Sequence, residues 1–249
     1  AVQKMDTESA DVFLNRLIKL NFHNKSKFTF QKFLSDGDHI TENMTAYING
    51  FSKDARDIID YFKFNEQIAR LDEAHLLFQI VQKFAAIDLH PEKVSNIEMG
   101  YIFEELIRKF ADASNETAGE HFTPREVIRL MVNVLFINDR DVLTKKGIIK
   151  TLYDPACGTG GMLSIAEEYL RDLNPQAELK VFGQELNPES FAICKSDMMI
   201  KAQVASNIKF GNSFTQDGLA SEKFDYMLSN PPFGVEWKKV QREIEAEHD

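Results

Sequence analysis

Residues 148–161 of the chain read IIKTLYDPACGTGG, a short apolar run that ends in an acid and passes into a glycine-rich turn. Apolar residues then recur at helical spacing from Met162 to Asp172. A strand, a glycine-rich turn and a helix in this order let a ligand approach backbone N–H groups closely. The turn has neither the Gly-Lys-Ser/Thr ending of a phosphate loop nor the G-x-G-x-x-G pattern of a dinucleotide site. Because Asp154 opens the turn and no lysine lies in it, we expect a ligand that is cationic at one end.

Three more strand-like runs follow, and each ends in polar or glycine-rich residues. They are residues 179–185, which end in Glu185, residues 207–213, and residues 224–229. In nucleotide-binding folds an acid at the end of the second strand takes the hydroxyls of a ribose. Helices are expected between the strands, over residues 162–172 and 188–202. The alternation of strands and helices predicts an α/β domain with a parallel, doubly wound sheet.

The last of these strands runs into Asn230-Pro231-Pro232-Phe233. Two prolines end a strand, because neither can donate a hydrogen bond to a neighbouring strand and each fixes φ. The segment therefore presents an Asn side chain, free carbonyl groups and an aromatic ring at the carboxyl end of a strand, where ligands bind in open α/β sheets. Taken alone, the tetrapeptide fits equally well an ordinary turn with Phe233 in the core. The ordered set of four strand ends favours a binding site.

Two motifs, residues 154–161 and residues 230–233, occur in the order found in DNA methyltransferases that act on amino groups, and the chain resembles that class. Residues 119–125, GEHFTPR, narrow the resemblance. They are similar to a segment of the modification subunit of type I restriction–modification systems, which precedes the glycine-rich turn and closes over the cofactor. The resemblance covers nearly the whole chain, including its helical first part. Cys157 differs slightly from the family pattern, in which small residues such as Ala are common.

The resemblance implies S-adenosylmethionine as the cofactor and assigns a role to each matching residue. Asp154 and the backbone of the turn would hold the methionine end, Glu185 would bind the ribose hydroxyls, and residues 121–125 would cap the pocket. The implied cofactor-binding residues are Glu120, His121, Phe122, Thr123, Pro124, Arg125, Asp154, Ala156, Gly158, Thr159, Gly160, Gly161, Glu185, Asn212 and Ser213. The last two would lie near the adenine ring of the cofactor. The implied catalytic residues are Asn230, Pro231, Pro232 and Phe233.

Methyl transfer to an aromatic amine suits these catalytic residues. The lone pair of such an amine is delocalised into its ring, which makes the nitrogen a weak nucleophile. Two acceptors, Asn230 and the carbonyl group of Pro231, would favour a pyramidal nitrogen that attacks the sulfonium methyl group in line, while Phe233 stacks on the base. The base must leave the duplex to reach such a pocket. The reaction needs no metal, and no Cys/His cluster with metal-ligand spacing is present in the sequence.

Two helix starts combine a capping residue with a proline. Asn187 is expected to cap the helix over residues 188–202, with Pro188 at its first position. Thr123, Pro124 and Glu126 fit a capping box, with Thr123 as the N-cap. A purely structural helix start therefore accounts for Thr123 without a ligand. A cofactor role for residues 121–123 depends on the resemblance.

The first part of the chain has helical periodicity over residues 9–20, 55–87 and 96–110. A polar segment, residues 112–117, separates it from the motifs. We therefore expect an all-helical domain over residues 1–117 and a Rossmann-like methyltransferase domain over residues 118–249. Three further strands normally complete the sheet in the family that the chain resembles. We expect the second domain to be incomplete at its C-terminal end, with much of the cofactor pocket retained.

Composition limits the possible partners. The chain has 39 acidic and 29 basic residues, and a net charge of −10 counts against binding DNA alone, because phosphate contacts dominate DNA affinity. The acidity is consistent with a subunit that acts on double-stranded DNA through partners. The resemblance implies a specificity subunit, a second copy of the modification subunit, and a restriction subunit in the full complex. With no run of 18 apolar residues, no signal peptide and two cysteines, we expect a cytoplasmic protein without a membrane segment.

The leading interpretation is an adenine-specific DNA methyltransferase that produces N6-methyladenine. Cytosine N4 and the side-chain amide of a protein glutamine are also planar amines that suit an Asn-Pro-Pro-aromatic motif. The long helical domain and residues 119–125 argue against glutamine, whereas the motif leaves the choice between the two bases open. A non-catalytic module that binds cofactor and partners is the alternative of another class. The intact motif at residues 230–233 argues against it.

Overall fold

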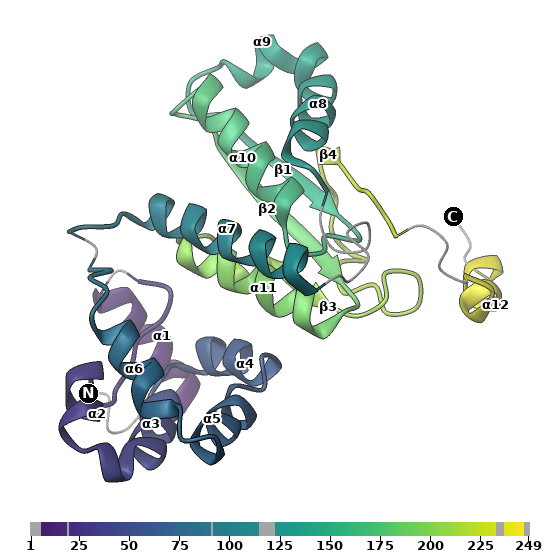
Figure 1. The fold of residues 1–249 in the computed structure, drawn as a ribbon. Helices are drawn as coiled ribbons and strands as arrows, with labels where there is room; N and C mark the ends of the chain where they lie inside the picture. Colours follow the sequence, from purple (N-terminus) through teal and green to yellow (C-terminus); the bar gives the residue numbers. More distant parts are fainter. Residues whose placement is uncertain (1–5, 19, 91, 115–122, 233–236, 247–249) are drawn as a thin grey trace. The chain divides into compact units, whose positions relative to one another are not determined.

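The computed structural model describes residues 6–18, 20–90, 92–114, 123–232 and 237–246. The chain divides into two compact units, which are described separately (Figure 1). Residues 1–101 and 198–204 form the first unit, and residues 102–197 and 205–249 form the second. The predicted domain boundary at residue 117 lies outside the described residues.

The second unit contains a four-stranded parallel sheet in the order β3-β2-β1-β4. Its strands are β1 (Ile149–Asp154), β2 (Glu178–Glu185), β3 (Ile208–Phe210) and β4 (Tyr226–Met227). The chain runs outward from β1 to β3 and then returns to the other side of β1, where β4 pairs with it. This reversal creates a switch point between β1 and β4, the place at which open α/β sheets bind ligands. The predicted parallel α/β sheet is confirmed.

The helices of this unit connect and flank the strands. α10 (Gly161–Leu173) packs against β1, β2 and α8 (Arg125–Phe136). α11 (Pro188–Ile200) follows β2 and begins with Pro188 at its first position, as predicted. Asn187 caps it, since its Oδ1 accepts hydrogen bonds from the N–H groups of Glu189 at 2.9 Å and Ser190 at 3.0 Å. Short segments complete the unit: η3 (Ile137–Asp139), α9 (Arg140–Leu143), η4 (Ala205–Asn207), η5 (Trp237–Val240) and α12 (Gln241–Glu245).

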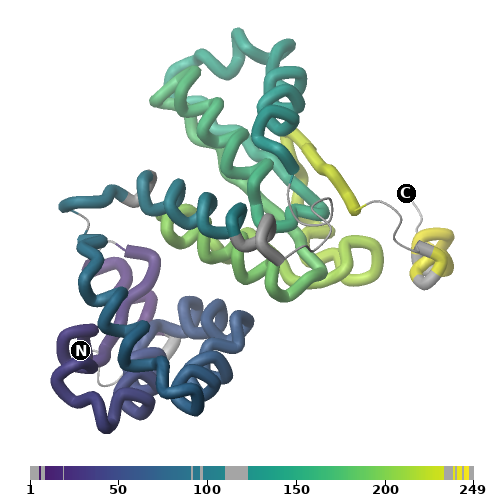
Figure 2. The backbone as a smooth tube through the Cα atoms, in the orientation of Figure 1, coloured from purple at the N-terminus to yellow at the C-terminus, as the bar shows by residue number. Residues whose placement is uncertain are grey.

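The short strand β4 is held to β1 by side chains as well as by its own pairing. Asp225, the residue before β4, accepts hydrogen bonds from the N–H of Thr151 at 2.9 Å and from its hydroxyl at 3.0 Å. Lys150 Nζ lies 2.7 Å from the same carboxylate and holds the pKa of Asp225 below its ordinary value. On the α8 side, Tyr226 packs edge-on against Phe136 at 4.9 Å and donates a hydrogen bond to Asp139. These contacts hold β4, which belongs to the yellow segment in Figure 2, against β1 and tie it to Phe136 and Asp139.

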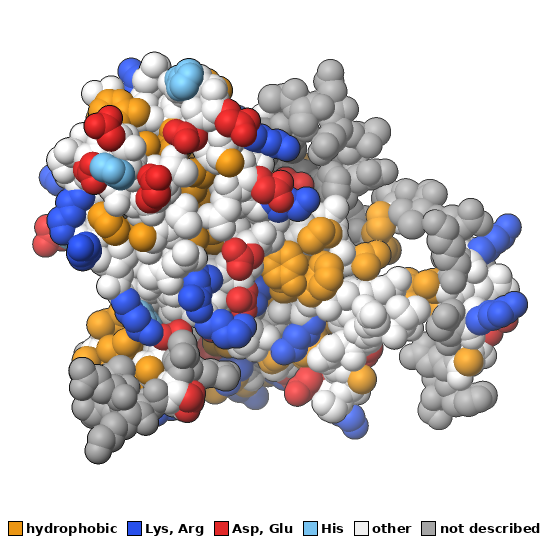
Figure 3. All heavy atoms as spheres, turned by 90° about the horizontal axis from the view of Figure 1, so that it is seen from below, with side chains coloured by type: hydrophobic (Ala, Val, Ile, Leu, Met, Phe, Trp, Pro, Cys, Tyr) orange, Lys and Arg blue, Asp and Glu red, His pale blue; other side chains and the backbone are white. Residues whose placement is uncertain are grey.

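Acidic and basic side chains are intermixed on the face of the molecule in Figure 3. On the part of this face that the described residues form, the blue side chains do not join into one continuous basic surface. Within the described ranges, no helix is long and apolar enough to cross a membrane.

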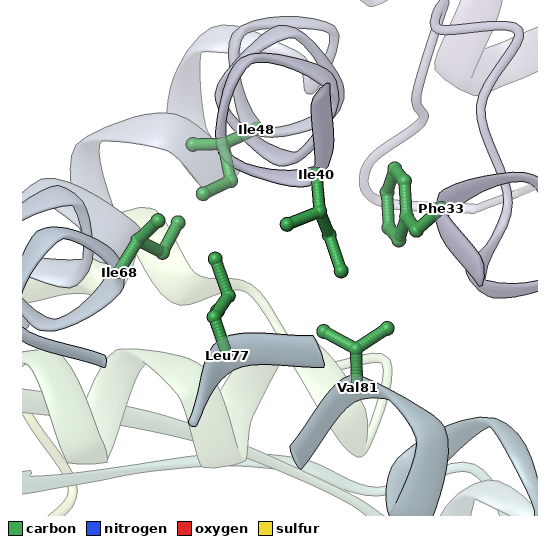
Figure 4. Packing of buried hydrophobic residues seen from close by; sticks show 6 residues of the cluster. All are labelled: Phe33, Ile40, Ile48, Ile68, Leu77 and Val81. Atoms are coloured by element: carbon green, nitrogen blue, oxygen red, sulfur yellow. The ribbon is translucent and has the colours of Figure 1, made fainter. Parts of the chain in front are cut away.

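The first unit is helical. It comprises α1 (Thr7–Ile18), α2 (Phe30–Ser35), η2 (Gly37–His39), α3 (Ile40–Asn49), α4 (Lys53–Tyr61), α5 (Phe64–Glu73), α6 (Leu77–Ala85) and the beginning of α7 (Asn96–Ser114). The predicted helical stretch 55–87 is helical but divided, because Lys63 and His75 adopt left-handed backbone conformations with φ of 50° and 56°. Phe33 is fully buried in the core of this unit, which α2, α3, α5 and α6 build together (Figure 4). Its buried members are Phe33, Ile40, Ile48, Ile68, Leu77 and Val81.

Candidate active site

Three of the predicted site residues lie at the carboxyl ends of neighbouring strands. Asp154 is the last residue of β1, Glu185 is the last residue of β2, and Asn230 follows β4 after two intervening positions. Because the strands are parallel, their carboxyl ends share one edge of the sheet, on either side of the switch point. The structure therefore brings together residues that are far apart in the sequence.

Asp154 is almost completely buried, with 2% of its surface exposed. Burial disfavours the charged carboxylate and raises its pKa to about 7, although the N–H of Ala156, 3.0 Å from Oδ1, and the hydroxyl of Ser229 oppose the rise. The Ser229 Oγ is buried and makes no hydrogen bond of ordinary geometry within the described part of the chain, so it acts on Asp154 as a nearby dipole. Glu185 adds a smaller repulsion that raises the pKa further. A cation at this position would favour the ionised carboxylate.

The glycine-rich turn depends on two glycines in the left-handed region. Gly158 has φ of +54° and Gly160 has φ of +87°. Gly160 also stands at the N-cap of α10, and a Cβ atom added there would lie 2.8 Å from Cys194 Sγ. The turn is closed by a hydrogen bond from the Gly160 N–H to the Cys157 carbonyl at 2.8 Å, and the Cys157 N–H donates to the Gln184 carbonyl at 3.0 Å. The turn is thus fitted closely against β2 and α11.

Cys157 and Cys194 lie beneath this turn as two buried free thiols with their sulfur atoms 4.0 Å apart. The neighbouring Cys194 and burial raise the pKa of the Cys157 thiol well above its ordinary value. Gly183 on β2 faces the same sulfur, since a Cβ added there would lie 2.9 Å from Cys157 Sγ. Cys157 therefore acts as a small, neutral packing residue.

Glu185 holds the turn from the other side. Its Oε2 accepts a hydrogen bond from the Gly158 N–H at 2.8 Å, and its Oε1 accepts one from the Asn187 N–H at 2.6 Å. A carboxylate offers about four lone-pair positions, so each oxygen can accept one more hydrogen bond from a ligand. The backbone carbonyl of Glu185 also accepts from the Gly211 N–H at 2.9 Å, which ties β2 to the end of β3.

The two residues predicted to lie near an adenine ring occupy the loop after β3. Ser213 donates a hydrogen bond from its hydroxyl to the Pro155 carbonyl, so it lies against the turn that Asp154 begins. Asn212 uses its side-chain oxygen within its own loop, accepting from the Phe214 N–H at 2.9 Å. The buried side chain of Gln184 holds the far end of this loop through Gln216 and Gly218.

Asn230 contacts Thr123. Its Nδ2 lies 3.0 Å from Thr123 Oγ1, and both side chains are partly buried. Pro231 and Pro232 are exposed. Phe233, the fourth predicted catalytic residue, lies outside the described residues, as do Glu120, His121 and Phe122.

The predicted capping role of Thr123 is wrong. α8 begins at Arg125, Pro124 occupies the N-cap position, and no side chain caps the helix there. Pro124 has an extended backbone with ψ of 137°, so Thr123 lies one residue too early to reach the first turn. The first helical hydrogen bond runs from the Ile128 N–H to the Pro124 carbonyl at 3.1 Å. The Thr123 hydroxyl instead takes part in the long-range contact with Asn230.

Arg125, predicted to bind the cofactor, is held by two carboxylates. Its guanidinium lies 2.6 Å from Glu104 Oε2 on α7 and 3.0 Å from Glu168 Oε2 on α10. A cavity of about 30 Å³ lies beside these ion pairs, lined by parts of α7, α8, α10 and α11 together with Thr159. It has room for one or two water molecules and is too small for a nucleoside. Over the described ranges, no group of three or more His, Cys, Asp or Glu residues could hold a metal ion.

Two family models match the chain. Residues 95–248 match the model of the N-6 DNA Methylase family, and residues 2–84 match that of the HsdM N-terminal domain. This chain belongs to the N-6 DNA methylase family. Its sheet and strand-end residues lie within the part that the first model covers.

Curated relatives of this methylase-family chain include methylase subunits of type I restriction enzymes. The MjaIX methylase subunit of Methanocaldococcus jannaschii is 31% identical over 163 residues, which cover 64% of this chain and 27% of that protein. The EcoEI methylase subunit of Escherichia coli is 29% identical over 217 residues, which cover 83% of this chain and 41% of that protein. The chain thus spans between about a quarter and two fifths of the length of these two relatives.

Solved structures share the fold. The methyltransferase subunit of a type I restriction–modification system from Streptococcus thermophilus superposes with a TM-score of 0.70 at 22% identity, over 96% of this chain and 51% of that one. A putative class I S-adenosylmethionine-dependent methyltransferase from Listeria monocytogenes gives a TM-score of 0.51 at 19% identity, over 86% of this chain and 61% of that one. At these identities, the two comparisons show that the fold is shared.

Three residues of this methylase-family site were not identified from the sequence alone: Gln184, Ser229 and Asp225. Each directly precedes a feature that was recognised, namely Glu185, Asn230 and β4. In the sequence, these residues are marked by their position next to a recognised residue or strand. Their roles depend on burial and on contacts with distant segments, which periodicity does not reveal.

Replacing Asp154 with Asn should remove a pH dependence of stability. The folded-state pKa of about 7 exceeds the ordinary value of 3.8, so the stability that the protonated carboxyl contributes is complete below about 3.8 and is lost as the pH rises to about 7. The free energy of unfolding of the wild type, minus that of Asp154→Asn, should fall by up to about 1.4 kcal/mol per pH unit between pH 5 and 7. Denaturation at several pH values measures this difference.

Asp225→Asn is the matched control. The pKa of Asp225 is lowered, so its contribution is lost only as the pH falls below its ordinary range, and the corresponding difference should stay level between pH 5 and 7. A level difference for Asp154→Asn as well would mean that the buried carboxyl titrates normally.

Gly160→Ala should destabilise the chain by more than Gly147→Ala. Both glycines have positive φ, at +87° and +69°, so each substitution incurs backbone strain of about 1–2 kcal/mol. Only at residue 160 does the new Cβ also collide with Cys194, because nothing lies within 4 Å at residue 147. Chemical denaturation compares the two variants, and Cys194→Ala combined with Gly160→Ala should recover the excess loss. Equal losses in the single variants would contradict close packing of the turn.

Proposed function

We propose that this chain is part of the modification subunit of a type I restriction–modification system and transfers a methyl group from S-adenosylmethionine to N6 of adenine in DNA. The observation that carries the proposal is the convergence of Asp154, Glu185 and Asn230 at one edge of the sheet, in a member of the N-6 DNA methylase family. The names of its curated relatives, which are methylase subunits of type I restriction enzymes, support it.

The residues at the glycine-rich turn fit S-adenosylmethionine, which carries positive charge at its methionine end and supplies an electrophilic methyl group. Buried Asp154, with its pKa of about 7, can become ionised when a cation lies beside it. The left-handed glycines 158 and 160 let a ligand approach the backbone without side chains in the way. Glu185 retains acceptor positions for ribose hydroxyls, and Ser213 lies against the turn. In this proposal residues 121–125 cap the pocket.

The target amine would be held by Asn230 Oδ1 and by the carbonyl group of Pro231. Both accept hydrogen bonds, so they draw the amine hydrogens away from the plane of the base and return electron density to its nitrogen. Phe233 would stack on the base after it has left the duplex. The contribution of the chain to the rate is positioning and preorganised acceptors, without a covalent intermediate.

Partners supply the recognition of DNA in this proposal. The net charge of −10 and the mixed charges in Figure 3 disfavour strong binding to DNA by this chain alone. We therefore propose assembly with a specificity subunit and a second modification subunit, and with a restriction subunit in the complete complex. The cytoplasm, where such a complex meets chromosomal DNA, is the proposed location.

Glu185→Gln should weaken the binding of S-adenosylmethionine by about tenfold or more, since hydrogen bonds to a charged group contribute about 1.5–3 kcal/mol. Titration calorimetry on the purified chain measures the affinity. Glu178→Gln, at the exposed opposite end of β2, is the matched control and should bind as the wild type does. Equal affinity of Glu185→Gln and the wild type would remove Glu185 from the cofactor site.

Asn230→Ala should reduce methyl transfer by at least about 100-fold and leave cofactor affinity unchanged, because an acceptor aimed at the reacting group is lost. Transfer is assayed with the assembled complex, DNA and labelled cofactor. Asn133→Ala, an exposed asparagine on α8, is the control and should retain full transfer. Unchanged transfer by Asn230→Ala would favour a non-catalytic cofactor-binding module. Methylated cytosine in the digested DNA of the wild-type reaction would replace adenine as the target.

A further inference from the structure

We infer that Thr123 is a positioning residue that orients the side-chain amide of Asn230 for the reaction, an inference that rests on the proposed function. The two side chains are 107 residues apart in the chain, and Asn230 Nδ2 donates to Thr123 Oγ1 over 3.0 Å. The contact joins the segment before α8 to the segment after β4. It is the contact that the Thr123 hydroxyl makes in place of the predicted helix cap.

The two ends of a side-chain amide have opposite hydrogen-bonding character. The oxygen accepts and the NH2 group donates, yet the two are nearly equal in size, and the torsion that exchanges them has two broad, similar minima. Only the orientation that places Oδ1 at the target amine is productive. In the other orientation an NH2 group would face the amine hydrogens, and donor would meet donor.

Thr123 removes this ambiguity when its own proton is given to another acceptor, because its oxygen can then only accept and a flipped amide would find no donor there. Because its oxygen accepts from Nδ2, the opposite end of the amide, Oδ1, is left for the amine. A threonine hydroxyl can accept two hydrogen bonds and donate one, so its own proton remains available for another acceptor. A cofactor contact through that proton is therefore compatible with the positioning role.

The backbone on both sides of the contact is anchored independently. α8 is fixed by the ion pairs of Arg125 with Glu104 and Glu168, and by the buried side chains of Ile128, Val132 and Phe136. The segment that leads to Asn230 is fixed by the hydrogen bond from the Leu228 N–H to the Tyr153 carbonyl at 3.0 Å and by the Asp225 contacts with β1. Loss of the Thr123 hydroxyl should therefore change the orientation of one amide and leave the fold in place.

Thr123→Val and Thr123→Ser test the inference in the assembled complex. Valine has nearly the shape of threonine without the hydroxyl, whereas serine keeps the hydroxyl. With saturating cofactor and DNA, Thr123→Val should slow single-turnover methyl transfer by about tenfold, the effect of losing one hydrogen bond that acts only on the reacting geometry. Because the rate is measured at saturating cofactor, a change in cofactor affinity does not enter it, and Thr123→Ser should restore most of the rate.

A second variant, Asn230→Asp, separates the effect of Thr123 on the orientation of the side chain at residue 230 from its other effects. In Asn230→Asp the two oxygens of the carboxylate are equivalent, so an acceptor faces the amine in either orientation. Adding Thr123→Val to Asn230→Asp should not lower the rate of methyl transfer further. The two substitutions are then non-additive, as the proposed role requires. A further tenfold loss in the double variant would overturn it.

The remaining outcomes are distinct. Wild-type rates in Thr123→Val would overturn the inference and leave the proposed function standing. Weaker cofactor binding with an unchanged rate at saturation would also overturn it, since Thr123 would then be a cofactor ligand. Absence of transfer by the wild-type complex would overturn the proposed function, and the inference with it.

Discussion

Pairing of β4 with β1, rather than with β3, is the constraint on which the candidate site depends. The strand is only two residues long, so its own ladder contributes little. Asp225 supplements it with hydrogen bonds to Thr151 and an ion pair with Lys150, and Tyr226 adds contacts with Phe136 and Asp139. Because β4 returns beside the central strand, the segment after it reaches Asp154 and the segment before α8. Without this pairing, Asn230 would have no fixed relation to the glycine-rich turn.

The electrostatics of the site follow from where the carboxylates lie. Asp154 is buried, and its charge is opposed by desolvation, whereas Glu185 is partly exposed and satisfied by two backbone N–H groups. The two acids, at adjacent strand ends, therefore differ in burial and in hydrogen bonding. The pKa of Asp154 is raised to about 7, so a cation beside it would favour its ionised form. The carboxylate of Glu185 already accepts two hydrogen bonds.

The strands and the strand-end residues could be predicted because a short apolar run bounded by Gly, Pro or an acid is typical of a buried strand. Asn187-Pro188 and Thr123-Pro124 show where that reasoning stops. Both pairs fit the start of a helix, yet Asn187 caps its helix while Pro124 itself occupies the N-cap position of α8. The difference lies in one backbone conformation and in the distant partner, Asn230, that Thr123 contacts. Lys63 and His75 are similar, because neither residue type indicates a left-handed conformation that interrupts a helical pattern. Long-range contacts and backbone choices of this kind depend on the assembled fold.

The two sulfur atoms beneath the turn limit which side chains relatives can carry at the neighbouring positions. Cys157 and Cys194 approach each other to 4.0 Å, and Gly160 and Gly183 each face one of the two sulfurs with no room for a methyl group. These four positions therefore share one small volume. A gain in size at any of them has to be matched by a loss at another, so substitutions across relatives should be correlated among the four sites even though they lie in three different segments of the chain, the turn, β2 and α11.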